Sequence, residues 1–108
     1  MKISKKNNET LVEYKNNNSI NVNIFNNEIL MAIVGSLDSN LKELEKISGS
    51  KIFFRGNSIT IRGDKETNER VKNAIKYLVD RYKLDKKIEK NDIFTSLKKD
   101  MTKDINNE

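Results

Sequence analysis

The segment between residues 34 and 64 restricts the possible folds of this chain most, because strong local signals follow one another there. An apolar run with helical spacing stops at a glycine, and a second helical pattern begins after a short loop. Two strand-like runs then flank Gly56-Asn57, a dipeptide that readily adopts the positive φ angles of a tight hairpin. The order predicts a helix ending at Gly35, a helix ending at Gly49, and antiparallel strands over 51–55 and 58–62.

The flanking residues extend this pattern on both sides. Ile20, Val22 and Ile24 alternate with polar residues, which predicts a half-buried strand. Asn26 or Asn27 can cap the helix that follows. In the second helix, Leu41, Leu44 and Ile47 form an apolar stripe. A long helix from Lys65 is predicted by the helical spacing of Val71, Ala74, Ile75, Leu78, Val79 and Tyr82. A last amphipathic helix over 92–101 carries Ile93, Phe94, Leu97 and Met101 on its apolar side.

These elements predict an α+β fold of the order β-α-α-β-β-α, with a three-stranded sheet covered on one face by helices and an extra C-terminal helix. We expect a flexible leader over 1–18, because it carries no sustained period. The folded domain is expected over 19–86, and 87–108 is expected to hold the C-terminal helix and a polar tail. Whether that helix belongs to the domain stays open.

Composition excludes several classes of function. The chain of 108 residues contains neither cysteine nor histidine, which excludes disulfides, imidazole bases and ordinary zinc sites. No apolar run could span a bilayer or serve as a signal region, so a cytoplasmic location and no membrane partner are expected. The net charge of +5 weakly favours polyanionic partners.

The loop between the first two helices bears on function. The predicted element order is that of a type I KH domain, which grips single-stranded nucleic acid with a Gly-x-x-Gly loop at a helix N-terminus. The corresponding loop here is Gly35-Ser36-Leu37-Asp38. Aspartate replaces the second glycine, and its carboxylate would repel phosphate. The structural explanation for Asp38 is that it caps the second helix.

Two longer motifs narrow the resemblance. Residues 24–35 with the G-x-x-D-x-N-L loop, and the hairpin R-G-N-x-I-x-I-x-G-D over 55–64, resemble the N-terminal region of PhoH-like proteins. In that family a small KH-like domain precedes a P-loop ATPase domain. The resemblance implies a phosphate starvation-associated, ATP-binding protein linked to RNA metabolism.

The chain departs from that family in one respect. None of its four glycines begins the G-x-x-x-x-G-K-[ST] loop that ATP binding needs. We therefore expect no enzyme activity and no cofactor in this chain, ATP being implied only for the missing ATPase domain. A split gene product, a truncated product and an excised domain are all compatible with the sequence.

Candidate nucleic-acid-binding residues are basic side chains and loop amides. Each lysine or arginine in such a set can neutralise one phosphate. The candidates are Gly35, Ser36, Lys42, Lys46, Lys51, Arg55 and Arg62. The alternative for each cation is that it belongs to the ordinary solvated surface of the protein and binds no ligand. Arg55 can equally form an ion pair with Asp64 or Glu45. Phe53 and Phe54 are neighbours on a strand and therefore face opposite sides of it. One is expected in the core, and the other can pack against a covering element or stack on a base.

Two functions therefore compete. The first is weak binding of single-stranded RNA that is delivered to a P-loop ATPase domain. The second is a protein-interaction or assembly module without nucleic-acid binding, in which the apolar side of helix 92–101 docks on a protein partner or on the ATPase domain. A carboxylate pair such as Glu43 and Glu45 lies two residues apart on a helix, so its members do not face each other as an acid and base would.

Overall fold

The computed structural model describes the backbone of residues 10–106 and the side chains of residues 10–98. The strands are β1 (Thr10–Asn16), β2 (Ser19–Ile24), β3 (Lys51–Arg55) and β4 (Ser58–Arg62). The α-helices are α2 (Asn27–Val34), α3 (Ser39–Ser48), α4 (Lys65–Asp85) and α5 (Lys90–Asn106), and η1 (Ser36–Asp38) is a 3₁₀ turn. Among the described residues no helix is long and apolar enough to cross a membrane.

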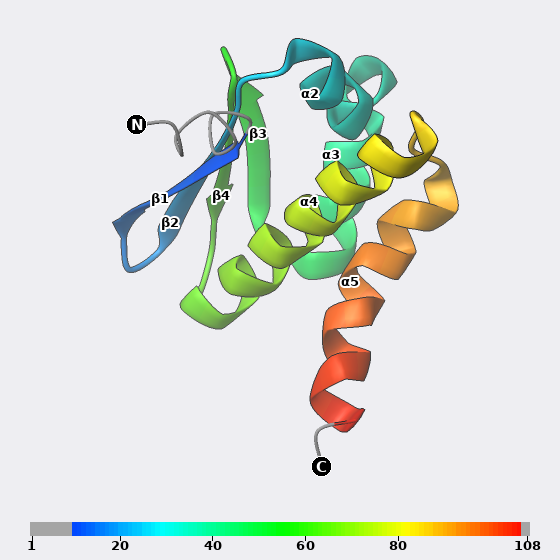
Figure 1. The fold of residues 1–108 in the computed structure, drawn as a ribbon. Coiled ribbons are helices and arrows are strands. Elements are labelled where there is room, and N and C mark those ends of the chain that lie inside the picture. Colours follow the sequence, from blue (N-terminus) through cyan, green and yellow to red (C-terminus); the bar gives the residue numbers. More distant parts are fainter. Residues whose placement is uncertain (1–9, 107–108) are drawn as a thin grey trace, which may run out of the picture.

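The strands form one antiparallel sheet in the order β1-β2-β4-β3. The helices all lie on one face of it, with α4 crossing the sheet and α5 packed against α4 (Figure 1). The described residues thus form a two-layer α+β domain in which no helix of theirs covers the other face of the sheet.

The core fills the space between these layers. Ile20, Val22 and Ile24 of β2 point into it, as their alternation predicts, together with Ile59 and Ile61 of β4. The helices contribute their predicted apolar stripes, namely Ile29, Leu30, Ile33 and Val34 of α2, Leu41 and Leu44 of α3, and Val71, Ala74, Ile75, Leu78 and Val79 of α4. Burial of these side chains on one face explains why the elements assemble in two layers.

The sheet has four strands rather than the predicted three, and the additional strand comes from the expected leader. The prediction of a flexible leader is wrong for residues 10–18, which form β1 and a tight turn to β2, whereas residues 1–9 lie outside the described part. Only Val12 of β1 packs against the core. A strand that buries one side chain gives little hydrophobic periodicity, which is why its pattern was weak.

Helix α3 departs from its predicted apolar stripe at one end. Leu41 and Leu44 are buried, but Ile47 is 42% exposed. A step of three residues falls about 60° short of a full turn in a helix with 3.6 residues per turn. Two such steps therefore carry Ile47 away from the core.

Helix α5 belongs to the same core as the rest of the domain. Ile93 and Leu97 are buried in it, and α5 packs against α4 and α3. The boundary expected at 86/87 therefore does not divide two separately packed units. The backbone of α5 stays helical to Asn106, so helix replaces most of the expected polar tail.

Candidate nucleic-acid interface

Gly35 ends α2 in a conformation that only glycine adopts easily. Its φ is +81°, and its amide donates to the carbonyl oxygen of Met31 at 3.0 Å. A Cβ atom there would lie 2.7 Å from the side chain of Asn40, whose amide nitrogen donates to the carbonyl oxygen of Ala32 at 3.2 Å. Backbone geometry and the Asn40 contact therefore account for this glycine without a ligand.

Asp38 does not cap α3, contrary to the structural explanation considered for it. Its φ and ψ are 60° and 21°, in the left-handed region, and its side chain makes no capping hydrogen bond. A capping side chain reaches the first-turn amides from an extended backbone, which this conformation does not provide. The preceding Leu37 also has a positive φ of 51°, and its side chain is 92% exposed.

Four of the predicted cations lie around one hollow between α3 and the sheet. The hollow is shallow and widely open to solvent, has a volume of about 450 Å³ and is lined by Lys42, Glu45, Lys46, Gly49, Ser50, Lys51 and Arg62. We call it the α3 groove. It brings together Lys42 and Lys46 from α3, Lys51 from the start of β3 and Arg62 from the end of β4. Glu45 is the one acid among its lining residues, and its carboxylate accepts a hydrogen bond from the Ile52 amide at 2.7 Å.

The remaining predicted residues lie away from the α3 groove. Gly35 and Ser36 precede the N-terminus of α3 and do not line the α3 groove, and Lys42 in the first turn of α3 is the lining residue nearest to them along the chain. Arg55 ends β3 at the hairpin turn. Within the described residues Arg55 forms no ion pair: Asp64 instead caps α4, and Glu45 binds the Ile52 amide. The loop therefore does not line the α3 groove, although it adjoins the helix end that carries Lys42.

The open face of the sheet carries a second hollow, of about 610 Å³. It is lined by Lys15, Asn16, Ser19, Asn21, Phe53, Arg55, Ser58, Thr60 and Arg62. Phe53 lies on this face and is 37% exposed, whereas Phe54 points the other way and packs against the core. Within the described residues no helix covers Phe53, so the covering element considered for it is not seen. Lys15 was missed because β1 was not predicted; the apolar pair Val12 and Tyr14, two positions apart, was the one weak signal, and the adjacent apolar Leu11 obscured it.

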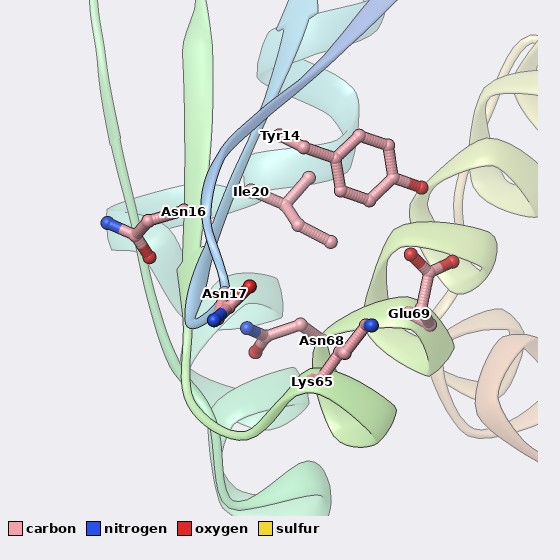
Figure 2. Close-up of a pocket in the computed structure, with 7 residues that line it drawn as sticks. All are labelled: Tyr14, Asn16, Asn17, Ile20, Lys65, Asn68 and Glu69. Carbon is pink, nitrogen blue, oxygen red and sulfur yellow. The ribbon is translucent and has the colours of Figure 1, made fainter.

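A third hollow lies between the β1–β2 turn and the first turns of α4. It holds about 340 Å³ and is lined by Tyr14, Asn16, Asn17, Ile20, Lys65, Asn68 and Glu69 (Figure 2). Asn68 spans the gap: its amide nitrogen donates to the carbonyl oxygens of Asn18 and Gly63 at 2.9 and 3.0 Å, and its oxygen accepts from the Ser50 hydroxyl at 3.1 Å. The polar atoms of Asn68 therefore form hydrogen bonds within the protein, and its position at this hollow has a structural explanation.

The charges beside this third hollow are also paired within the protein. The Lys72 ammonium lies 2.9 Å from the Glu69 carboxylate and donates to the Tyr14 hydroxyl at 3.2 Å. The Lys72 hydrogen bond lowers the pKa of Glu69. Burial opposes the charged form of Lys72, but its hydrogen bonds to Glu69 and Tyr14 prevail and raise its pKa. Both groups therefore stay charged and anchor β1 to α4.

The apolar side predicted for helix 92–101 is largely occupied. Ile93 and Leu97 are buried, whereas Phe94 is 44% exposed. The side chain of Met101 lies outside the described part of the chain. Of the described residues of this helix, Phe94 is thus the one large apolar side chain open to a partner.

No cluster of three or more carboxylates that could hold a metal ion occurs within the described residues. Comparisons of the chain with protein-family models, with curated proteins and with solved structures find no match.

Proposed function

We propose that this chain is a KH-like domain of the kind found at the N-terminus of PhoH-like proteins, and that it binds single-stranded RNA weakly. It would act in the cytoplasm and present RNA to a P-loop ATPase domain that this sequence does not contain. The order of elements from β2 to α4 supports the KH-like part of the proposal, because it is β-α-α-β-β-α. The loop and hairpin motifs of residues 35–41 and 55–64 support the family.

The observation that carries RNA binding is the gathering of Lys42, Lys46, Lys51 and Arg62 around the α3 groove. Two of these cations come from a helix and two from strand ends, so their proximity is produced by the fold. No ion pair within the described residues neutralises any of the four. A phosphodiester chain is the ligand class that such a row of cations complements.

Salt dependence of binding tests this proposal. Anisotropy of a labelled single-stranded RNA, titrated with the protein at about 50 and 200 mM salt, should show affinity that falls steeply with salt. The slope of log K against log salt should be close to −0.7 for each phosphate contacted. A matched DNA oligomer tests the choice of RNA. If neither oligomer binds at low salt, the proposal is wrong.

Charge reversal tests the groove itself. Lys42→Glu with Lys46→Glu should weaken RNA binding at least about ten-fold at low salt and flatten the salt slope, because two phosphate contacts become repulsive. The control is Lys76→Glu with Lys90→Glu, which changes the net charge equally at exposed positions on α4 and α5. If both double variants lose affinity equally, overall charge rather than the α3 groove governs binding.

A further inference from the structure

The open face of the sheet carries a regular pattern of side chains. Strand β3 presents Lys51, Phe53 and Arg55 there, and their partners on β4 are Arg62, Thr60 and Ser58 respectively. Side chains two positions apart on a strand are separated by about 7 Å. An aromatic ring is thus flanked by cations both along its own strand and across to the next.

The charge on this face is strongly one-sided. Its cations are Lys15, Lys51, Arg55 and Arg62, and its one carboxylate is Glu13 on β1. Within the described part of the chain none of the four cations forms an ion pair, whereas pairs do occur on α4 and α5. An uncompensated basic surface complements a polyanion better than a second copy of this basic chain.

Phe53 and Arg62 together form a stacking surface. The Arg62 guanidinium lies 5.5 Å from the centroid of the Phe53 ring, and the ring is 37% exposed. Nucleobases stack on aromatic rings and on arginine planes alike, and stacking tolerates any base sequence. The covering helices lie on the opposite face (Figure 1), so a base can reach the ring.

Polar groups beside this surface can bind base edges. The Thr60 hydroxyl donates to the Asn21 side-chain oxygen at 3.0 Å, which leaves the Asn21 amide group as a donor toward the open face. Ser58 similarly contacts the side-chain oxygen of Asn23. These side chains replace the apolar layer that a protein-covered sheet face would need.

Arg62 connects the open face to the α3 groove, because it lines both hollows. Lys51, its register partner on β3, lines the α3 groove beside it. We propose that single-stranded RNA passes from the α3 groove around the edge strand β3 onto the open sheet face, where Phe53 and Arg62 stack a base and Arg55 and Lys15 hold phosphates. This inference rests on the proposed RNA binding and adds a second surface to it.

Substitution of Phe53 tests the second surface. Phe53→Ala should weaken binding of a 12-nucleotide RNA at least about five-fold, the loss expected for one stacked base, with little change in the salt slope. Phe94→Ala, at a comparably exposed phenylalanine on α5, is the matched control and should bind as wild type. Arg55→Gln should lower the steepness of the salt slope by about 0.7. A ¹H–¹⁵N spectrum establishes that each variant is folded.

Photocrosslinking supplies a readout of position. RNA containing 5-iodouridine should crosslink to the peptide that contains Phe53 in the wild-type chain, and this crosslink should be lost in Phe53→Ala. If Lys42→Glu with Lys46→Glu weakens binding but Phe53→Ala does not, the second surface is wrong and the proposed function stands. If Phe53→Ala alone weakens binding, the open face binds RNA and the α3 groove is not part of the site. If Phe53→Ala leaves RNA binding intact but alters the sedimentation of the protein, the face is a protein contact and the inference is overturned.

Discussion

Single residues account for much of the way this domain is joined together. Asn68 is 1% exposed, and its hydrogen bonds tie the β1–β2 turn, the end of β4 and the segment before β3 to α4. Gly63 lies beside it so closely that a Cβ atom would be 2.8 Å from the Ser50 hydroxyl. A small polar cluster, and not only the apolar core, thus fixes where α4 begins relative to the sheet.

Asn68→Ala should destabilise the protein by about 1–3 kcal/mol, because it removes three hydrogen bonds and leaves the buried Ser50 hydroxyl without its acceptor. Urea denaturation followed by circular dichroism measures the change. Asn73→Ala is the control, since Asn73 lies on the same helix and is exposed. Equal stabilities of the two variants would mean that the cluster contributes nothing net.

Asp38→Gly should raise both stability and RNA affinity. Glycine adopts the left-handed conformation of this position without strain, which should gain up to about 1 kcal/mol. Removal of the carboxylate also removes a repulsion from phosphate. Thermal melting and RNA anisotropy measure the two effects separately. A more stable variant with unchanged affinity would show that the loop does not approach RNA.

At the scale of elements, α2 and α4 each begin at a capping side chain, of which Asn26 was predicted as a cap and Asp64 was not. Asn26 accepts from the Ile29 amide at 3.1 Å at the start of α2. Asp64 accepts from the Thr67 amide at 2.9 Å at the start of α4. Hydrogen bonds from the Thr67 amide and hydroxyl lower the pKa of Asp64.

The Asp64 carboxylate should stabilise the fold in a pH-dependent way. Because its pKa is lower in the folded state, its contribution is complete above the unfolded pKa of about 3.8 and is lost as the pH falls through the lower folded pKa. The melting temperature of Asp64→Asn should therefore lie below that of the wild type at pH 6, and the two should converge as the pH falls below the folded-state pKa of Asp64. Asparagine keeps an oxygen for the Thr67 amide but loses the acceptor of the Thr67 hydroxyl, so the comparison measures the charge together with that second hydrogen bond. A constant difference across this pH range would contradict the prediction.

At the scale of the whole molecule, α5 completes the core instead of extending from it. Ile93 is fully buried among residues of the helical layer, and Phe94 beside it is exposed. Ile93→Ala should cost about 2–5 kcal/mol through the cavity it leaves. Phe94→Ala should change stability by less than about 0.5 kcal/mol. Urea denaturation measures both changes. Similar losses of stability in the two variants would contradict the burial of Ile93 and the exposure of Phe94.

Because α5 completes the core, removal of residues 87–108 should lower the melting temperature.

The candidate interface shows why sequence reasoning could go only part of the way. Lys42 and Lys46 lie one turn apart on a predicted helix, so their shared face followed from spacing. Their proximity to Arg62 depends on how α3 packs on the sheet, which no local pattern contains. Gly35 had a recognisable motif, yet the Asn40 contact that explains it appears only in three dimensions.

The sequence by itself determined the elements with strong periods or strong turn chemistry. These are β2, the β3–β4 hairpin at Gly56-Asn57, and the buried stripe of α4, because hydrophobic periodicity and positive-φ glycine are local properties. Only the tertiary structure decided the rest. Strand β1 exists through pairing with β2, Asp38 takes a left-handed conformation instead of capping α3, and Phe53 rather than Phe54 faces the open side. Each of these depends on a neighbour distant in sequence or on the path of a loop, and local propensity carries little information about either.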